Sequence, residues 1–193
     1  MTILCIGDSN TYGYDPRSFL GSRYPADVRW TERLPGVTVL NGGVNGMRIP
    51  PADAAGIAAI REKAPTLIAV MLGTNDLLEG TGAGKTAERM EEYLSALREA
   101  GPEILLIAPP PLQRGEWVQN EELITRSKKL ASLYREIAER SGLAFADAGQ
   151  WGVELCFDGV HFSPRGHAAF AAGLAEALGR HLRETGEENG LHS

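Results

Sequence analysis

The sequence has few cysteines and no long apolar run, and both absences limit what the chain can be. Only two of its 193 residues are cysteines, Cys5 and Cys156, and they form no Cys-x-x-Cys pair. We therefore expect two buried free thiols rather than a disulfide or a metal site. No window reaches the roughly 20 apolar residues that a membrane-spanning helix needs. The N-terminus has no basic segment ahead of its apolar run, so we expect no signal peptide and a cytoplasmic location.

The chain also lacks an excess of positive charge. It carries 19 Lys and Arg against 25 Asp and Glu, a formal net charge of -6. This balance argues against nucleic acid as a partner. An apolar content of 43% predicts a folded chain. We place a single domain at residues 1–183 and a polar tail at residues 184–193.

Five short apolar runs predict the strands of a sheet. They are nearly continuous in Ile, Leu and Val, which is typical of parallel strands covered on both faces. The runs are Thr2–Ile6, Val37–Leu40, Leu67–Leu72, Ile104–Ala108 and Leu143–Ala146. Helical patterns follow four of them, at Pro51–Ala64, Lys85–Ala100, Glu121–Ser141 and Ser163–Leu182. This alternation predicts right-handed crossovers and a three-layer α/β/α sandwich.

Two connections are longer than a minimal strand-to-helix link. They are Tyr14–Arg33 and Pro109–Asn120, and both follow predicted strands. They should therefore lie at the carboxyl edge of the sheet, where open α/β sheets bind ligands. Trp117, on the second loop, is a candidate for lining a substrate pocket.

Ser9 follows the first predicted strand directly, and three interpretations of it are open. A serine at such a turn can cap a helix. A loop rich in Ser, Thr and Asn after the first strand can also hold the phosphate of a flavin nucleotide. The third interpretation is a nucleophile, which requires a histidine base, a carboxylate that orients it, and oxyanion donors.

His161 is the histidine that fits the third interpretation. Asp158 lies three residues before it, in a segment with a glycine, so a turn can fold the carboxylate onto the imidazole. His167 and His181 look like residues on the surface of a helix, and His192 lies in the tail.

Oxyanion donors are expected after the second and third strands. The glycines of "NGGVNGMR" allow backbone N–H groups to be exposed, and "GTND" offers the side-chain amide of Asn75. In a sheet of order 2-1-3-4-5 the first strand lies between the second and third, which would bring Ser9, Gly46 and Asn75 together. Strand 5 would then lie about 15 Å from strand 1. The connection 148–162 must therefore run back across the sheet if His161 is to reach Ser9.

Other motifs are interpreted as structural. The segment "EGTGAGKT" is not a phosphate-binding P-loop, because Glu79 stands where the first glycine is required. It is expected to be a loop before a helix. The signature Gly-x-Ser-x-Gly is absent, because Thr11 stands at its second glycine. Three acidic residues lie near strand ends, and we expect each to hold a loop by hydrogen bonds: Asp8, Asp76 and Asp147.

Four blocks in order resemble the SGNH hydrolases, also called GDSL-type esterases and lipases. The blocks are "GDSN" at residues 7–10, "NGGVNG" at 41–46, "GTND" at 73–76 and "DGVH" at 158–161. The opening block looks closest to the branch of small bacterial arylesterases and acyltransferases. The resemblance implies a flavodoxin-like α/β/α fold with a five-stranded parallel sheet of order 2-1-3-4-5.

The resemblance also implies roles for the site residues. Ser9 would be the nucleophile, His161 its base and Asp158 the partner that orients His161. The oxyanion donors would be the backbone N–H groups of Ser9 and Gly46 and the side-chain amide of Asn75. Known members hydrolyse carboxylic esters or thioesters without a cofactor, so we expect a small-molecule ester substrate, no cofactor and no metal. Related small esterases often associate, which leaves a homo-oligomer open.

Two residues depart from the family pattern. Asn10 replaces the usual leucine of the first block, and Arg48 stands where threonine is common. Both are candidates for the wall of the substrate pocket, and Arg48 is alternatively the partner of an acid. We expect a serine esterase of small, short-chain acyl substrates. The alternatives are an acyltransferase, thioesterase or lysophospholipase with the same triad, and, from a different class, a flavin- or phosphate-binding flavodoxin-like module.

Overall fold

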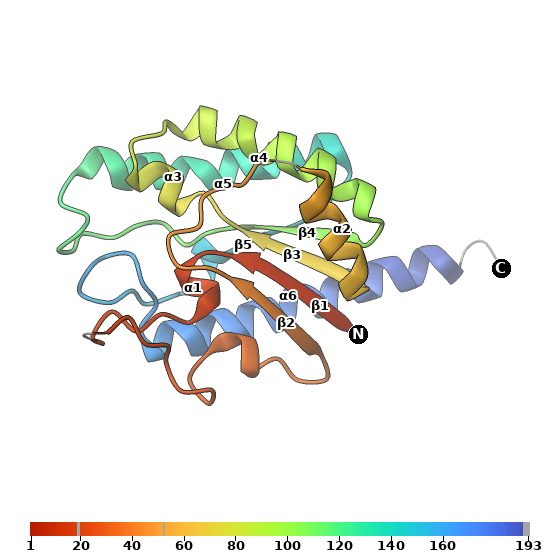
Figure 1. Ribbon diagram of the computed structural model, residues 1–193, viewed down its shortest axis with the longest axis horizontal. Coiled ribbons are helices and arrows are strands. Elements are labelled where there is room, and N and C mark those ends of the chain that lie inside the picture. The colour runs from red at the N-terminus through yellow and green to blue at the C-terminus, as the bar shows by residue number, and fades with distance from the viewer. Residues whose placement is uncertain (19, 52, 191–193) are drawn as a thin grey trace.

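The computed structural model describes residues 1–18, 20–51 and 53–190 and contains a parallel sheet of five strands (Figure 1). The strands are β1 Thr2–Gly7, β2 Thr38–Gly43, β3 Leu67–Met71, β4 Glu103–Ala108 and β5 Ala144–Asp147. Their order across the sheet is β2-β1-β3-β4-β5, and all four pairings are parallel. The predicted α/β class and strand order are confirmed.

Helices cover both faces of the sheet and complete the predicted sandwich. They are α1 Ser9–Tyr12, α2 Ala54–Lys63, α3 Thr74–Leu78, α4 Ala83–Leu97, α5 Glu121–Ser141 and α6 Pro164–Gly190, with short 3₁₀ turns η1 Trp30–Glu32, η2 Arg98–Ala100 and η3 Ala148–Gln150. Figure 1 shows α2, α4 and α5 on one side of the sheet and α6 on the other. The sheet is therefore the middle layer.

Two hydrophobic clusters lie on opposite faces of the sheet, because successive strand residues point to opposite sides. In β1, Leu4 and Ile6 join the cluster that packs against α2, α4 and α5. Their neighbours Ile3 and Cys5 join the cluster that contains Trp30 and the buried residues of α6. Burial on both faces is the reason that the strands are apolar throughout rather than alternating.

Helix ends follow their capping residues. The predicted bounds of α5 are confirmed: the Asn120 side chain accepts a bond from Glu122 N at 2.8 Å, and Gly142 ends the helix at a φ of 59°. Ser163 caps α6 as expected, since its Oγ accepts from Gly166 N at 3.0 Å. At its other end α6 continues beyond Leu182 to Gly190.

The predicted polar tail therefore begins inside α6 (Figure 1). Its last residues, 191–193, lie outside the described residues, and the domain bounds remain a prediction. None of the helices in the described ranges is long and apolar enough to cross a lipid bilayer.

His167 corrects one expectation from the sequence. It is only 1% exposed rather than on the surface, because helical spacing places it on the same face of α6 as Phe170 and Leu174. Trp30 N donates to its Nδ1 at 3.4 Å, and the ring of Tyr24 contacts it edge-on. Burial, followed by the charges of nearby arginines, lowers the pKa of His167 to about 4. His167 is thus a neutral core residue.

Two other side chains also lie at a different depth from the one expected. His181 is half-buried on α6, with Nε2 2.8 Å from Glu103 Oε2. Both cysteines are free, but only Cys5 is buried. Cys156 is half-buried, because it lies in a loop and its Sγ is 3.5 Å from the hydroxyl of Tyr24.

Candidate active site

Ser9 is the first residue of α1, a single helical turn that begins directly after β1. Asp8, rather than Ser9, caps this turn: its side chain accepts a bond from Asn10 N at 2.9 Å. A Cβ at Gly7 would lie 2.0 Å from Thr11 Oγ1, so the turn can pack this closely only on a glycine. Ser9 is 6% exposed at the carboxyl edge of the sheet.

The carbonyl end of α1 is held by side chains from other segments. A single turn is too short to be stable alone, and its last carbonyl groups lack partners within the helix. Three side chains supply donors: Trp30 Nε1 to Asn10 O at 2.9 Å, Asn41 Nδ2 to Thr11 O at 2.9 Å, and Arg23 Nε to Tyr12 O at 2.6 Å. Two of these donors come from the 14–33 loop. That loop therefore fixes the turn that carries Ser9.

Ser9, His161 and Asp158 form one hydrogen-bonded chain. His161 Nε2 lies 3.0 Å from Ser9 Oγ, and Nδ1 lies 2.7 Å from Asp158 Oδ2. Both distances are within hydrogen-bonding reach. The structure thus brings together three residues that were predicted from separate blocks of the sequence.

Asp158 is an ionised acceptor although it is buried. Burial alone would raise the pKa of its carboxyl group, but hydrogen bonds from the side chain and backbone of His161 and from the backbone of Val160 lower it on balance. The two backbone bonds, from Val160 N at 2.8 Å and His161 N at 2.9 Å, both reach Oδ1. Since a carboxylate only accepts, Nδ1 of His161 donates, and Nε2 is left to accept from the Ser9 hydroxyl.

The 148–162 connection does run back toward β1, as the sequence predicts. A second loop, within 109–120, holds it there through backbone bonds. These are Gln113 N to Gly159 O at 3.1 Å, Glu116 N to Phe157 O at 3.0 Å and Trp117 N to Asp158 O at 3.1 Å. A Cβ at Gly115 would lie 2.4 Å from the carbonyl carbon of Asp158, so the two loops are in direct contact.

The predicted oxyanion residues lie at the ends of the two neighbouring strands. Asn75 is in the first turn of α3, and its Nδ2 donates to Met47 O at 3.0 Å. Gly46 has a φ of 71°, and a Cβ there would meet no atom within 4 Å. Gly43 is different, because its N–H already donates to Asn41 Oδ1 at 2.9 Å. Of the two glycines, Gly46 is thus the more accessible.

Acidic residues at the strand ends brace loops, as expected. Asp76 accepts from Ile49 N at 3.0 Å and Asp147 from Gly149 N at 2.9 Å. Asp8 is also buried, and burial raises the pKa of its carboxyl group to about 6 despite the opposing effects of the Asn10 N–H and of His161. These residues hold backbone in place around the site.

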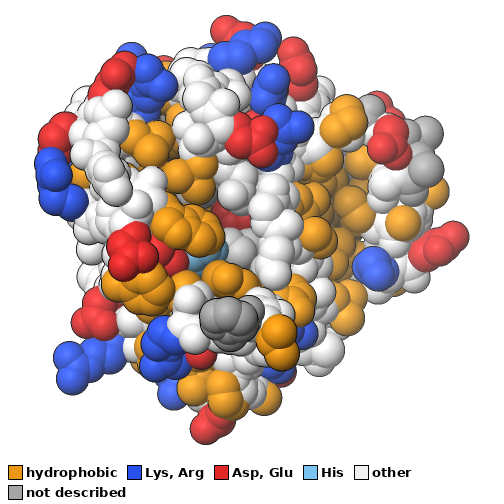
Figure 2. Space-filling view, turned by 60° about the vertical axis from the view of Figure 1, so that its left-hand side comes forward, with side chains coloured by type: hydrophobic (Ala, Val, Ile, Leu, Met, Phe, Trp, Pro, Cys, Tyr) orange, Lys and Arg blue, Asp and Glu red, His pale blue; other side chains and the backbone are white. Residues whose placement is uncertain are grey.

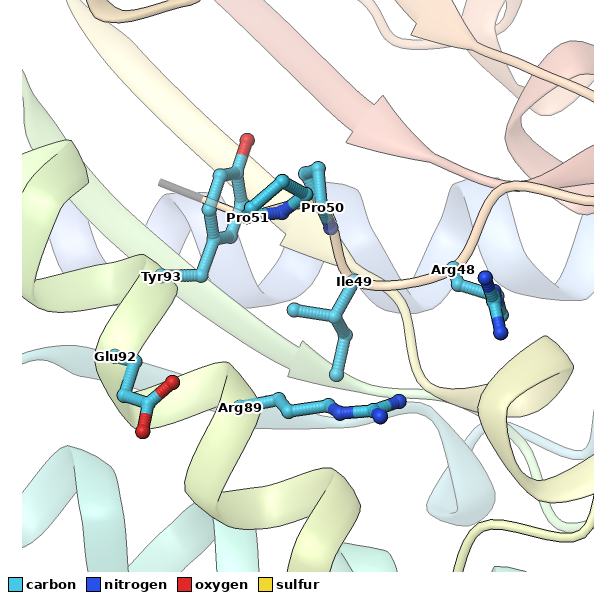
Figure 3. Close-up of a pocket in the computed structure, with 7 residues that line it drawn as sticks. All are labelled: Arg48, Ile49, Pro50, Pro51, Arg89, Glu92 and Tyr93. Carbon is cyan, nitrogen blue, oxygen red and sulfur yellow. The ribbon is translucent and has the colours of Figure 1, made fainter. Parts of the chain in front are cut away.

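Arg48 pairs with an acid and also lines a cavity. Its Nη1 lies 2.6 Å from Glu79 Oε2 on the surface. Figure 3 shows Arg48 at the rim of a cavity of about 320 Å³, with Ile49 and Arg89 beside it and Tyr93 at the far side. Arg89 is in turn paired with the buried Asp76 at 3.1 Å. Both cations are neutralised, so the cavity has no free positive charge from these two residues.

Aromatic rings flank the imidazole of His161. The Tyr14 ring centroid is 4.6 Å away and that of Trp117 is 5.2 Å away in an edge-on contact. Trp117 is 56% exposed. Two other hydrophobic side chains, Val44 and Phe157, are exposed to a similar degree, and they lie close in sequence to Gly46 and Asp158 respectively. Figure 2 shows histidine atoms bordered by hydrophobic and acidic side chains. Sequence reasoning missed Tyr14, whose closeness to Ser9 in the chain was the available signal.

No group of three or more His, Cys, Asp or Glu side chains within residues 1–18, 20–51 and 53–190 is arranged to hold a metal ion. The segment 79–86 leads into α4, with Gly82 at its N-cap.

The chain and its fold match a known family. The chain matches the GDSL-like Lipase/Acylhydrolase family over residues 5–169. It therefore belongs to this family, whose members are also called SGNH hydrolases, and is a carboxylic ester hydrolase of the GDSL type.

Similar proteins span almost the whole chain. An arylesterase from Vibrio mimicus is 22% identical, covering 93% of this chain and 89% of that protein. The structure of a candidate arylesterase from Agrobacterium tumefaciens is 31% identical with a TM-score of 0.77, covering 92% of this chain and 97% of that one. A carbohydrate acetylesterase family member from Sinorhizobium meliloti is 28% identical with a TM-score of 0.75, covering 92% and 96%.

Proposed function

We propose that this protein is a serine esterase that hydrolyses small carboxylic esters with short acyl chains through an acyl-enzyme on Ser9. The observation that carries the proposal is the chain from Ser9 Oγ through His161 to the ionised Asp158, with distances of 3.0 and 2.7 Å. This geometry matches a nucleophile, its general base and the group that orients the base.

In the proposed mechanism His161 moves a proton in two directions. Its Nε2 takes the proton of Ser9 as Oγ attacks the ester carbonyl carbon and a tetrahedral oxyanion forms. His161 then gives this proton to the leaving alcohol oxygen as the ester C–O bond breaks. A water molecule, deprotonated by His161, attacks the acyl-enzyme in the same way and releases the acid and free Ser9.

The oxyanion would be held by three N–H donors: the backbone groups of Ser9 and Gly46 and the side-chain amide of Asn75. The Ser9 N–H lies at the start of α1, where a helix has no internal acceptor for it. The N–H of Gly43 is a poor alternative because Asn41 already accepts from it. Each such donor typically contributes about 3 kcal/mol to transition-state stabilisation.

The surroundings of His161 favour an apolar or aromatic group next to the scissile bond. Tyr14 and Trp117 present rings beside the imidazole, and Trp117 is largely exposed and free to contact a ligand. Among the predicted pocket residues, Trp117 thus has the clearest support. The name carbohydrate acetylesterase agrees with a small acyl group, and the name arylesterase agrees with an aromatic alcohol portion. Water is the proposed acceptor of the acyl group. Transfer of the acyl group to an alcohol instead of water would use the same residues.

A Ser9→Ala variant tests the proposal with p-nitrophenyl acetate as substrate. We expect kcat to fall by roughly 10³-fold or more, because the acyl-enzyme cannot form. Ser132→Ala is the matched control: Ser132 lies exposed on α5, where its hydroxyl donates to Lys129 O, and this variant should keep wild-type kinetics. Full turnover by Ser9→Ala would show that Ser9 is not the nucleophile. Bound flavin with no esterase activity would instead support the flavin-binding alternative.

A further inference from the structure

The side chain of Asn10 bonds to the backbone on both sides of His161. Its Nδ2 donates to Val160 O at 3.1 Å, and its Oδ1 accepts from Phe162 N at 2.9 Å. Asn10 is 5% exposed, so both bonds are shielded from water. One side-chain amide thus replaces the donor and acceptor that a neighbouring strand would offer to this segment.

The backbone around His161 is also held from within its own loop and, at residues 157–159, by the 109–120 loop. His161 N donates to Asp158 Oδ1 at 2.9 Å, and Cys156 N donates to His161 O at 2.7 Å. These bonds fix the shape of the loop and orient the imidazole relative to Asp158. They do not fix the distance from the loop to α1.

Asn10 supplies that connection, because it follows Ser9 in the same helical turn. The backbone of Asn10 is itself held, since Trp30 Nε1 donates to its carbonyl at 2.9 Å. A shift of residues 160–162 relative to α1 would break both amide bonds and would change the separation of His161 Nε2 and Ser9 Oγ. A buried carbonyl and a buried N–H would then lose their partners.

We propose that Asn10 is a positioning residue that sets the distance between Ser9 and His161 by fixing the backbone on both sides of His161. This inference rests on the proposed function of Ser9 and His161. It also accounts for the departure of this chain from the leucine that is usual at this position. A leucine side chain has a similar volume but can neither donate to Val160 O nor accept from Phe162 N.

Asn10→Leu and Asn10→Ala test the proposal, the first keeping side-chain volume and the second avoiding a steric clash. For p-nitrophenyl acetate we expect kcat to fall roughly 10- to 100-fold with little change in KM, because a misplaced base slows proton transfer. The kcat/KM for ethyl acetate should fall by a larger factor than the kcat/KM for p-nitrophenyl acetate. The alkoxide of ethyl acetate needs a proton from His161 in order to leave, whereas p-nitrophenolate leaves without one.

The leaving-group comparison separates positioning from stability. A variant that merely unfolds in part loses the same factor on both esters, because fewer molecules are active. Thr66→Val is the matched control, since it also removes two hydrogen bonds between distant segments, to Thr2 N and Thr2 O, at the opposite edge of the sheet. It should leave the ratio of the two kcat/KM values at its wild-type level. Circular dichroism checks that each variant is folded.

Equal losses on the two esters, or wild-type kinetics in folded Asn10→Leu and Asn10→Ala, would overturn the proposal. The Ser9→Ala variant keeps the two claims apart. If Ser9→Ala is inactive while the Asn10 variants behave as wild type, only the role of Asn10 fails. If Ser9→Ala is active, the proposed function itself fails.

Discussion

At the scale of single residues, Gly7 shows how closely the nucleophile turn is packed. The atoms of Thr11 occupy the space that a Cβ at position 7 would need, and Thr11 itself is 1% exposed and cannot move into solvent. The glycine of the first block therefore serves packing rather than chemistry. It allows α1 to begin immediately after β1, which is what places Ser9 at the edge of the sheet.

We predict that Gly7→Ala destabilises the fold by roughly 1–3 kcal/mol, the usual cost of forcing an extra carbon into a packed site. Gly84→Ala is the control, because Gly84 lies in α4 and a Cβ there meets no atom within 4 Å. Its stability should be unchanged or slightly raised, since alanine favours helix. Urea unfolding of both variants measures the difference. Equal stabilities would contradict the packing role assigned to Gly7.

At the scale of elements, α6 and the 14–33 loop are joined through a buried histidine. His167 accepts from Trp30 N, and Trp30 in turn packs its ring 4.7 Å from that of Phe170. The same Trp30 donates to α1. A change in the docking of α6 is thereby connected, through one tryptophan, to the turn that carries Ser9.

The buried groups Asp8 and His167 predict opposite effects of pH on stability. His167 has a pKa of about 4 in the fold against an ordinary value of 6.5, so the unfolded chain binds an extra proton between these values and stability falls as pH falls from 6.5 to 4. Asp8 has a pKa of about 6 against an ordinary value of 3.8, so the folded chain binds the extra proton and stability rises as pH falls from 6 to 3.8. We therefore expect the two contributions to cancel in large part in the wild type.

Asp8→Asn should remove that cancellation. Between pH 6.5 and pH 4 we expect this variant to lose up to about 3 kcal/mol more stability than the wild type, from 1.36 kcal/mol per pKa unit. Urea unfolding at a series of pH values measures both proteins. Parallel pH curves for the two proteins would show that Asp8 is not held neutral by burial.

At the scale of the whole molecule, the sheet brings three distant parts of the chain to one edge. The order β2-β1-β3-β4-β5 places β1 between β2 and β3, so Ser9, Gly46 and Asn75 follow adjacent strands. The fourth part, which carries Asp158 and His161, does not follow a strand adjacent to β1. The 148–162 connection starts beyond β5 at the far side of the sheet, and the 109–120 loop and Asn10 hold its end against α1.

The strands and the chain of Ser9, His161 and Asp158 could be predicted from the sequence, because apolar runs and short blocks are local signals. The strand order followed from the βαβ alternation and the family resemblance. What the sequence did not reveal depends on distant contacts. The side-chain amide of Asn10 forms hydrogen bonds with Val160 and Phe162, which are separated from it by 150 and 152 positions in the sequence. Its partners are backbone atoms, which are the same for every residue type, so the sequence does not point to them.

Two other differences have local causes that sequence reasoning overlooked. Asp8 is the better cap for α1 because it directly precedes the turn, where a cap residue must stand. The burial of His167 was signalled by its helical spacing from Phe170 and Leu174, which form one apolar face. In both cases the sequence contained the signal. The cap was considered at Ser9 instead of Asp8, and His167 was assigned to the exposed face of its helix instead of the buried one.

The most direct test of the central claim is to locate the nucleophile on the chain with a reagent that labels it covalently. Diethyl p-nitrophenyl phosphate reacts with activated serines, releases p-nitrophenolate and leaves a stable diethylphosphoryl ester that peptide mass spectrometry can find. We predict one such group per chain, on the peptide that contains Ser9, and almost none in a His161→Ala variant. A label on another residue, or equal labelling of His161→Ala, would contradict the account.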